Sequence, residues 1–158
     1  MIIIDGYNLL HSIHKLQEEA EAINDVQLCW IVGRFLKLVG EKGQIIFDGT
    51  GPRDKSGFDN ISNLEVFFAG QGSDTDTVIE DKIRASTAPK RLTIVSSDRR
   101  LRKAAQARKS AVIKSEDFWR NLQKQFRRKK APKEPAEKRL GLTESETQQW
   151  LKFFGLEQ

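Results

Sequence analysis

Short runs of Ile, Val and Phe recur along the 158-residue chain, and stretches with helical periodicity separate them. This alternation is typical of βαβ units, in which crossover helices join parallel strands. We therefore expect an α/β fold with a mostly parallel central sheet of about five strands. The strands are predicted at residues 1–5, 44–48, 64–69, 91–96 and 111–114, and the helices at residues 9–21, 25–41, 76–86, 99–108 and 116–129.

The chain is predicted to divide into one main domain, residues 1–130, and two short C-terminal segments. Residues 131–142 hold prolines among charged residues, a composition typical of an extended linker. Residues 143–155 begin with a capping box and carry an apolar face that includes Trp150, which predicts a short amphipathic helix. A helix of about 12 residues is marginal by itself, so we expect it to dock on the main domain or on a partner.

Charge is distributed unevenly along the chain. Residues 1–80 carry 6 Lys and Arg against 13 Asp and Glu, a net charge of −7, whereas residues 81–140 carry 20 against 6, a net charge of +14. The basic part favours binding of a polyanion, and the acidic part repels the same ligand unless cations neutralise it. The two parts are therefore predicted to have separate roles.

Several classes of protein are excluded by composition. No apolar run approaches the roughly 18 residues that span a bilayer, and the opening residues meet Asp5 too early for a signal sequence, so we expect a cytoplasmic protein with no membrane partner. Cys29 is the only cysteine, which excludes an internal disulfide and a cysteine-based zinc site. Cys29, Trp30 and Trp119 lie among apolar neighbours and are predicted to be core residues.

Acidic residues follow the ends of the predicted strands. Asp5 and Asp48 directly follow apolar runs, and Asp98 follows a third run after two serines. Asp76, with Glu80 one helical turn later, opens the helix after another strand. Because the carboxyl ends of parallel strands meet at one edge of a sheet, we expect these acids to converge there.

Converging carboxylates require positive charge. Two like charges 4 Å apart repel by about 4 kcal/mol at an effective dielectric constant of 20. With no histidine pair or thiolate cluster nearby, oxygen ligands favour Mg²⁺ or Mn²⁺, which can activate water for hydrolysis of a nucleic acid backbone. Taken singly, each acid is also typical of a helix N-cap or a turn, so the prediction depends on their coincidence. His11 and His14 are predicted to have surface or packing roles, because an oxygen-rich site needs no imidazole.

The opening motif Ile3-Ile4-Asp5-Gly6-Tyr7-Asn8-Leu9-Leu10 is similar to the signature of the NYN domain family of PIN-like ribonucleases, particularly its YacP-like branch. The likeness continues through Ile46-Phe47-Asp48-Gly49, Asp76-Thr77-Val78-Ile79-Glu80 and Val95-Ser96-Ser97-Asp98, and so spans residues 1 to about 120. The resemblance implies a PIN-like three-layer α/β/α fold. It also implies a Mg²⁺- or Mn²⁺-dependent endoribonuclease that binds RNA.

The resemblance also implies which residues act. Asn8 matches the asparagine that completes the first motif; its amide can orient Asp5 or a metal-bound water, or it can cap a helix. Either Asp74 or Asp76 can supply the second acid, and the spacing to the following Ile and Glu favours Asp76. Many PIN-like nucleases have a further acid close to the position of Asp98, whereas this chain has Arg99 and Arg100 there, which argues against a second metal. The implied metal ligands are Asp5, Asp76 and Asp98, with Asp48 and Glu80 as weaker matches.

Basic residues near the predicted site are expected to bind RNA phosphates that flank the scissile one. Solvated helix faces and a polar tether are the alternative roles for these charges. They lie around the helix that follows Asp98 and at the end of the last helix of the main domain: Arg99, Arg100, Arg102, Lys103, Arg108, Lys109, Arg127, Arg128, Lys129 and Lys130.

The sequence leaves three functions open. The first is an endoribonuclease that acts on single-stranded or exposed RNA, with ribonucleoprotein or ribosome-associated RNA as a further candidate partner. The second is a non-catalytic RNA- or ribonucleoprotein-binding module with the same fold. The third is a receiver-type phosphoacceptor domain, in which Lys114 takes the place of the lysine that follows a late strand; it is disfavoured because paired acids do not follow the first strand.

Overall fold

The computed structural model describes residues 1–17 and 22–130, so the predicted linker and C-terminal helix lie outside the described residues. The strands are β1 (Ile2–Asp5), β2 (Gly43–Phe47), β3 (Leu64–Phe68), β4 (Thr93–Val95) and β5 (Ala111–Ile113). They pair in parallel in the order β3-β2-β1-β4-β5, with β1 in the centre. The predicted five-stranded parallel sheet is confirmed for this part of the chain.

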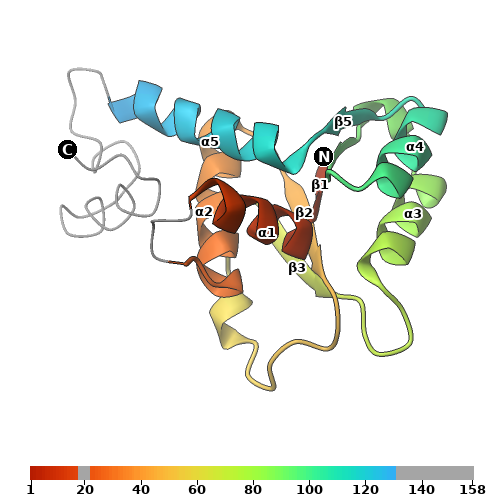
Figure 1. Ribbon diagram of the computed structural model, residues 1–158, viewed down its shortest axis with the longest axis horizontal. Helices are drawn as coiled ribbons and strands as arrows, with labels where there is room; N and C mark the ends of the chain where they lie inside the picture. Colours follow the sequence, from red (N-terminus) through yellow and green to blue (C-terminus); the bar gives the residue numbers. More distant parts are fainter. Residues whose placement is uncertain (18–21, 131–158) are drawn as a thin grey trace.

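Helices cover both faces of the sheet. They are α1 (Gly6–Leu16), α2 (Asp25–Val39), α3 (Thr75–Ala85), α4 (Arg99–Ala107) and α5 (Ser115–Lys130), and short 3₁₀ turns lie at Ser56–Phe58 and Pro89–Arg91. Helices α1, α2 and α5 pack together on one face, and α3 and α4 pack together on the other (Figure 1). This arrangement is the predicted three-layer α/β/α fold. None of the described helices is long and apolar enough to cross a membrane.

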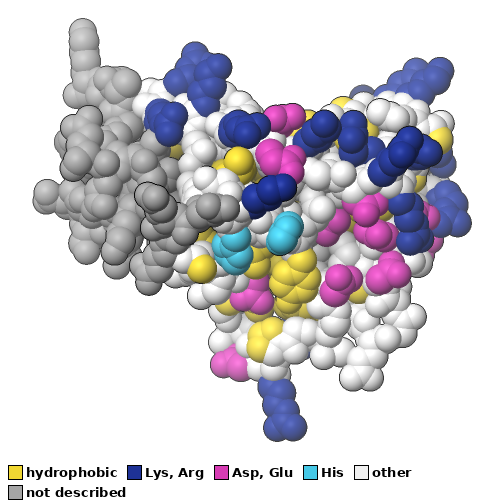
Figure 2. All heavy atoms as spheres, viewed as in Figure 1, with side chains coloured by type: hydrophobic (Ala, Val, Ile, Leu, Met, Phe, Trp, Pro, Cys, Tyr) yellow, Lys and Arg dark blue, Asp and Glu magenta, His cyan; other side chains and the backbone are white. Residues whose placement is uncertain are grey.

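Charged side chains divide the surface in the same view. Figure 2 shows Lys and Arg side chains spread over α4 and α5, and Asp and Glu side chains gathered below them between α1 and α3. The basic and acidic parts of the sequence therefore meet on one face of the folded domain.

The turn between β1 and α1 is tight. Asp5 is the N-cap of α1 and accepts the backbone N–H of Asn8, so the helix begins at Gly6, three residues before its predicted start. A Cβ at Gly6 would lie 2.5 Å from the ring of Phe47 and 2.9 Å from the carbonyl oxygen of Ile46. Only glycine therefore fits where α1 leaves the sheet, and the helix starts in contact with β2.

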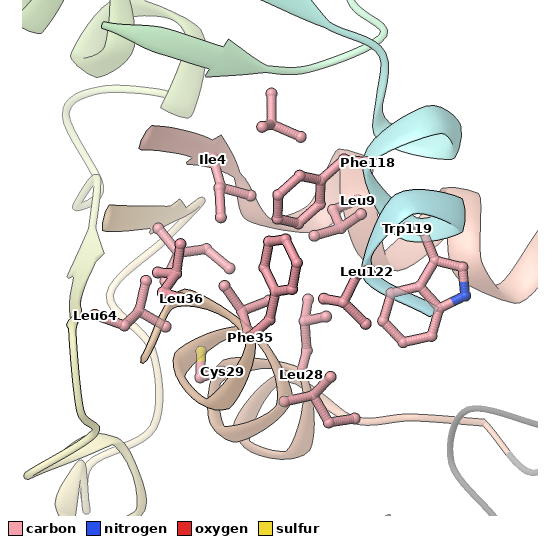
Figure 3. Packing of buried hydrophobic residues seen from close by; sticks show 14 of the residues in the cluster. Ile4, Leu9, Leu28, Cys29, Phe35, Leu36, Leu64, Phe118, Trp119 and Leu122 are labelled. Atoms are coloured by element: carbon pink, nitrogen blue, oxygen red, sulfur yellow. The ribbon is translucent and has the colours of Figure 1, made fainter. Parts of the chain in front are cut away.

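Two hydrophobic cores of unequal size flank the sheet. The larger lies under α1, α2 and α5, where the ring of Phe35 meets that of Phe118 edge-to-face, 5.5 Å apart (Figure 3). The smaller lies under α3 and α4 and contains Ile79, Ile83 and Leu101. Alternate residues of each buried strand face opposite cores, as expected for a sheet covered on both sides.

The structure confirms two predicted core residues and corrects a third. Cys29 and Trp119 are fully buried. Trp30 is 38% exposed on α2, where its indole Nε1–H donates to the carbonyl of Gly57 at 2.9 Å, so the core prediction was wrong. An indole can cover a loop with its apolar face while its N–H bonds the backbone, and the apolar neighbours in sequence lie on the other side of the helix.

Candidate active site

The sheet register brings the predicted acidic residues to one edge. Asp5 at the end of β1 pairs with Ile46 of β2, and Ile4 pairs with Val95 at the end of β4. Asp5 is therefore level with Ser96, the first residue after β4. The chain changes direction across the sheet between β1 and β4, and the carboxyl edge at such a switch point is where open α/β sheets bind ligands.

Asp5 is a buried acid. The residue is 7% exposed, and its carboxylate accepts the N–H of Asn8 at 3.5 Å and the hydroxyl of Ser96 at 3.2 Å. Burial, with smaller contributions from the charges of Asp76 and Asp48, raises the pKa of Asp5 to about 6 against the lowering effect of the two hydrogen bonds. The ionised carboxylate is therefore under-compensated in the described part of the chain.

Asp48 joins the end of β2 to the start of α3. Its Oδ1 atom accepts the backbone N–H of Thr75 at 2.8 Å and the hydroxyl of Thr75 at 2.7 Å. Because Thr75 is buried, this contact ties α3 to the sheet edge. Asp48 itself is exposed, and its second oxygen makes no hydrogen bond within the described residues.

The two acids at the start of α3 have different surroundings. Asp74 is the exposed N-cap and accepts the N–H of Thr77 at 2.7 Å. Asp76 is half-buried, and its pKa is raised first by burial and then by the charge of Asp98, with smaller contributions from Asp74 and Asp48. Asp76 is thus the acid of this pair that interacts with the other strand-end carboxylates.

Asp98 is the N-cap of α4 and shares a serine with Asp5. Its Oδ1 atom accepts the N–H groups of Arg100 at 2.8 Å and Leu101 at 3.2 Å. Its own N–H donates at 3.0 Å to the Ser96 hydroxyl, the group that donates to Asp5. One buried serine therefore holds two acids in fixed relation. We call Asp5, Asp48, Asp76 and Asp98 the acidic group.

Arg100 brings positive charge to the acidic group. Its guanidinium is ion-paired with Glu80 and lies 4.0 Å from the carboxylate of Asp76, and these groups raise the pKa of Arg100. No other described cation forms an ion pair with these acids. Glu80, predicted as a weaker metal ligand, is thus occupied by an arginine.

A hydrogen-bonded network lies beside the acidic group. The Oδ1 atom of Asn8 accepts the N–H of Ser97 at 2.9 Å and the hydroxyl of Ser115 at 2.6 Å. Since a backbone N–H can only donate, the Asn8 atom that faces Ser97 is the amide oxygen, and the NH₂ group has no acceptor among the residues that the structure describes. Asn8 therefore does not cap a helix. Ser115 is the first residue of α5, and the residue before it, Lys114, supplies the first carbonyl of that helix, which accepts the N–H of Phe118.

Glu116 completes this network. Its carboxylate accepts the hydroxyl of Ser97 at 2.8 Å and that of Ser12 at 3.3 Å, and the pKa of Glu116 is lowered, chiefly by Ser97. The N–H of Ser115 in turn donates to the Ser97 hydroxyl at 3.1 Å. The network joins the loop after β4 to α1 and α5. We call its members the serine–asparagine network: Asn8, Ser12, Ser97, Ser115 and Glu116.

The serine–asparagine network was largely missed from sequence. Ser115 and Glu116 are the second and third residues after β5, so the rule that selected the acids after other strands also selects them. A serine before a helical stretch is a typical N-cap, so the sequence around Ser115 indicates a capping role first. Their position after a parallel strand was the usable signal.

The predicted RNA-binding residues have unequal environments. Arg99 and Lys103 are exposed on α4, and Lys109 is exposed after it. Arg102 is half-buried, and its Nε–H has no hydrogen-bond partner among the described residues. Arg108 donates to the carbonyls of Arg84 at 2.9 Å and Ser86 at 3.1 Å, and so caps the end of α3.

At the far end of α5, Arg127 and Arg128 are exposed, while the side chains of Lys129 and Lys130 lie outside the described residues. Arg127 and Arg128 belong to α5, over which Figure 2 shows Lys and Arg side chains. Neither histidine contacts the acidic group through a hydrogen bond within the described chain; His14 Nε2 is 3.0 Å from the carbonyl oxygen of Ile23.

The acidic group suits a hydrated cation. No three His, Cys, Asp or Glu side chains among the described residues are grouped so that they could hold a metal ion together. Mg²⁺, however, keeps several waters and is commonly bound by one or two carboxylates together with substrate phosphates. The oxygen-only donors and the mutual repulsion at Asp5 and Asp76 fit such an ion.

Comparisons with known proteins give one family and one fold. A family model of the YacP-like NYN domain matches residues 2–153. No curated protein matches the chain by comparison. Among solved structures, the chain is similar to Rae1 (YacP) from Bacillus subtilis, with 18% identity and a TM-score of 0.64 over 81% of this chain and 76% of that one. A mutant of that protein aligns with 17% identity and a TM-score of 0.63, over 97% and 91% of the two chains.

Proposed function

Because the chain belongs to the YacP-like NYN domain family, a family of PIN-like RNA nucleases, we propose that it is a metal-dependent endoribonuclease of the cytoplasm. It hydrolyses phosphodiester bonds in single-stranded or exposed RNA. The observation that carries the proposal is the buried, under-compensated carboxylate of Asp5 at the carboxyl edge of the sheet, within electrostatic range of Asp48 and Asp76.

The proposed cofactor is Mg²⁺ or Mn²⁺. Asp5, Asp76 and Asp98 would hold the hydrated ion, in part through its bound waters, with Asp48 near it. A divalent ion at this position supplies positive charge to the phosphate and lowers the pKa of water. We leave Glu80 out of the ligand set because its carboxylate is paired with Arg100.

The chain's own residues orient the substrate around that centre. The free NH₂ group of Asn8 and the guanidinium of Arg100 are donors for oxygens of the scissile phosphate. Exposed Arg99 and Lys103 on α4 bind the flanking phosphates, and Ser96 keeps Asp5 and Asp98 in register. Hydrolysis adds water to phosphorus and breaks one P–O bond of the backbone.

RNA is the proposed substrate, with ribonucleoprotein or ribosome-associated RNA as a further candidate. The exposed arginines on α4 and α5 support a polyanionic partner, because cations that release counterions from a nucleic acid strand strengthen binding without reading sequence.

The proposal is tested by incubating the full chain with end-labelled single-stranded RNA and Mg²⁺ or Mn²⁺. We expect internal cleavage that stops with EDTA and is abolished by Asp5→Asn and Asp98→Asn. Asp117→Asn is the matched control, because Asp117 is an exposed acid paired with Arg120 on α5. Circular dichroism should show that all variants are folded. No cleavage by the metal-loaded wild type, or equal cleavage by the Asn variants, overturns the proposal.

One observation favours the second candidate, an RNA-binding module that does not cut. This is the absence, among the described residues, of three clustered side chains able to hold a metal ion. Calorimetric titration with Mn²⁺ separates the two functions. Binding that Asp5→Asn removes supports the nuclease, whereas salt-sensitive RNA binding without carboxylate-dependent Mn²⁺ binding supports the module.

A further inference from the structure

Tyr7 is a large aromatic residue that remains exposed beside the acidic group. It lies two residues after Asp5, in the first turn of α1. The other exposed aromatic side chain of residues 1–17 and 22–130, Trp30, donates its indole N–H to the carbonyl of Gly57. Five large hydrophobic residues in the described chain are exposed: Met1, Tyr7, Leu16, Trp30 and Val39. Of these, only Tyr7 closely follows the carboxyl end of a strand: Met1 precedes β1, Leu16 is the last residue of α1, and Trp30 and Val39 lie in α2.

The ring of Tyr7 is anchored on one side. Its centroid lies 5.0 Å from that of Phe47, with an angle of 62° between the rings. Phe47 is fully buried and stacks on Phe68 at 5.9 Å. The missing Cβ at Gly6 lets α1 approach Phe47 closely. Tyr7 is thus held by a rigid aromatic base while 41% of its surface stays exposed, so ligand binding costs it little conformational entropy.

The surroundings of Tyr7 favour a neutral planar ligand. Asp48 and Asp25 lie within electrostatic range of its hydroxyl, so a phosphate is repelled there. The hydroxyl makes no hydrogen bond within the described residues and can donate to a base or a ribose. His11, one turn further along α1, is exposed. Figure 2 shows the two histidines beside an exposed hydrophobic patch, with acidic side chains close by.

We propose that Tyr7 is a stacking platform for an unpaired nucleobase of single-stranded RNA, next to the phosphate held at the acidic group. This inference rests on the proposed function. Bases stack on aromatic side chains in single-stranded complexes, and this contact tolerates any sequence because every base has a π-face. The strand would then lie with its phosphates toward the arginines of α4 and one base toward α1.

The arrangement predicts selection for unpaired RNA. A base within a duplex is already stacked and paired, so it reaches Tyr7 only after that pairing is lost. The discrimination comes from the aromatic ring and not from the carboxylates, which makes it separable from catalysis by mutation.

The test measures binding of a single-stranded oligoribonucleotide that contains 2-aminopurine, in Mg²⁺ and with Asp98→Asn present in every protein so that the strand stays intact. Stacking on an aromatic ring quenches the fluorescence of this base. We expect Tyr7→Leu to raise the Kd about 10-fold, which corresponds to about 1.4 kcal/mol, and to remove the quenching, since a base–aromatic stack contributes binding energy of this order. Tyr7→Phe, which keeps the ring, should bind within about twofold of wild type. Leu16→Ala is the matched control, since Leu16 is 40% exposed at the other end of the same helix.

The outcomes separate this inference from the proposed function. Unchanged affinity and quenching in Tyr7→Leu overturn the stacking role, and so does an equal loss of affinity for a blunt RNA duplex. If wild type cleaves RNA while Tyr7→Leu binds normally, the inference fails and the nuclease stands. If binding and quenching depend on Tyr7 but no variant or condition yields cleavage, the nuclease fails and the stacking site stands. Loss of binding in Tyr7→Phe also counts against stacking, because the ring is retained.

Discussion

The acidic group and the serine–asparagine network lie side by side at one sheet edge, yet their electrostatics are opposite. Burial and neighbouring carboxylates raise the pKa of Asp5 to about 6, whereas the hydroxyls of Ser97 and Ser12 lower the pKa of Glu116. Folding therefore opposes the charge of one acid and stabilises the charge of the other. The ionised carboxylate of Asp5 thus lowers the stability of the fold, whereas the hydrogen bonds of Glu116 stabilise the same edge of the sheet.

The largest effect should come from Asp76→Asn. Loss of a metal-binding carboxylate removes several kcal/mol of transition-state stabilisation, so we expect kcat/KM for RNA cleavage to fall about 10³-fold. Asp74→Asn is the matched control, because Asn also serves as an N-cap and Asp74 is exposed. Asp74→Asn should cleave end-labelled single-stranded RNA at a rate close to that of wild type. Equal losses in the two variants would contradict the assignment of Asp76.

The next effect is on stability and depends on pH. The folded-state pKa of Asp5 is raised from 3.8 to about 6, so ionised Asp5 opposes folding above about pH 6, and this cost disappears as the pH falls through 3.8. In EDTA, Asp5→Asn should therefore stabilise the fold at pH 7 by up to about 3 kcal/mol, and by almost nothing near pH 4.

Urea unfolding of wild type and Asp5→Asn at both pH values measures this difference. Asn also caps helices, so loss of the α1 cap does not obscure the result. Mg²⁺ should raise the melting temperature of wild type and leave that of the variant unchanged. A variant less stable than wild type at pH 7 would show that Asp5 is compensated after all.

A smaller loss of activity is expected from Ser115→Ala, which removes a hydroxyl donor to Asn8. Loss of a hydrogen bond that orients a residue of a metal site typically lowers activity 10–100-fold, and we expect about 10-fold here. The free energy of unfolding should fall by about 1–2 kcal/mol. Ser110→Ala is the control: this buried serine donates to the carbonyl of Pro89 at 2.7 Å, before β5, away from the site. It should lose similar stability and keep full activity. Equal losses of activity in Ser115→Ala and Ser110→Ala would show that the serine–asparagine network does not position the site.

The smallest effect is expected when a single arginine near the acidic group is replaced. Arg99→Gln should weaken RNA binding a few-fold and reduce the slope of log Kd against log salt concentration by about 0.7, because one phosphate contact is lost. Arg108→Gln should leave the slope unchanged and lower the melting temperature, since Arg108 caps α3. Fluorescence anisotropy across a salt series gives both slopes. A reduced slope for Arg108→Gln would show that Arg108 contacts an RNA phosphate.

The sequence predicted the edge of the sheet at which the acidic residues lie, but not all of the contacts that their side chains make. The strands before Asp5, Asp48 and Asp98 were predicted to within a few residues because buried parallel strands form apolar runs. The pairing of Arg100 with Glu80 was not predicted, since it joins α4 to α3. Trp30 was misplaced because apolar neighbours in sequence do not show which side of a helix a residue occupies.

The sequence by itself determined the α/β fold, the family and the edge of the sheet where acids gather, because hydrophobic periodicity and strand-end residues are local properties of the chain. Only the tertiary structure decided which polar groups meet. Asn8 and Ser115 are 107 positions apart, yet they share a hydrogen bond of 2.6 Å. Such contacts depend on how α1 and α5 pack over the core between them, and no local pattern encodes that distance. The charge state of each acid follows from the same packing, since burial and neighbours set its pKa.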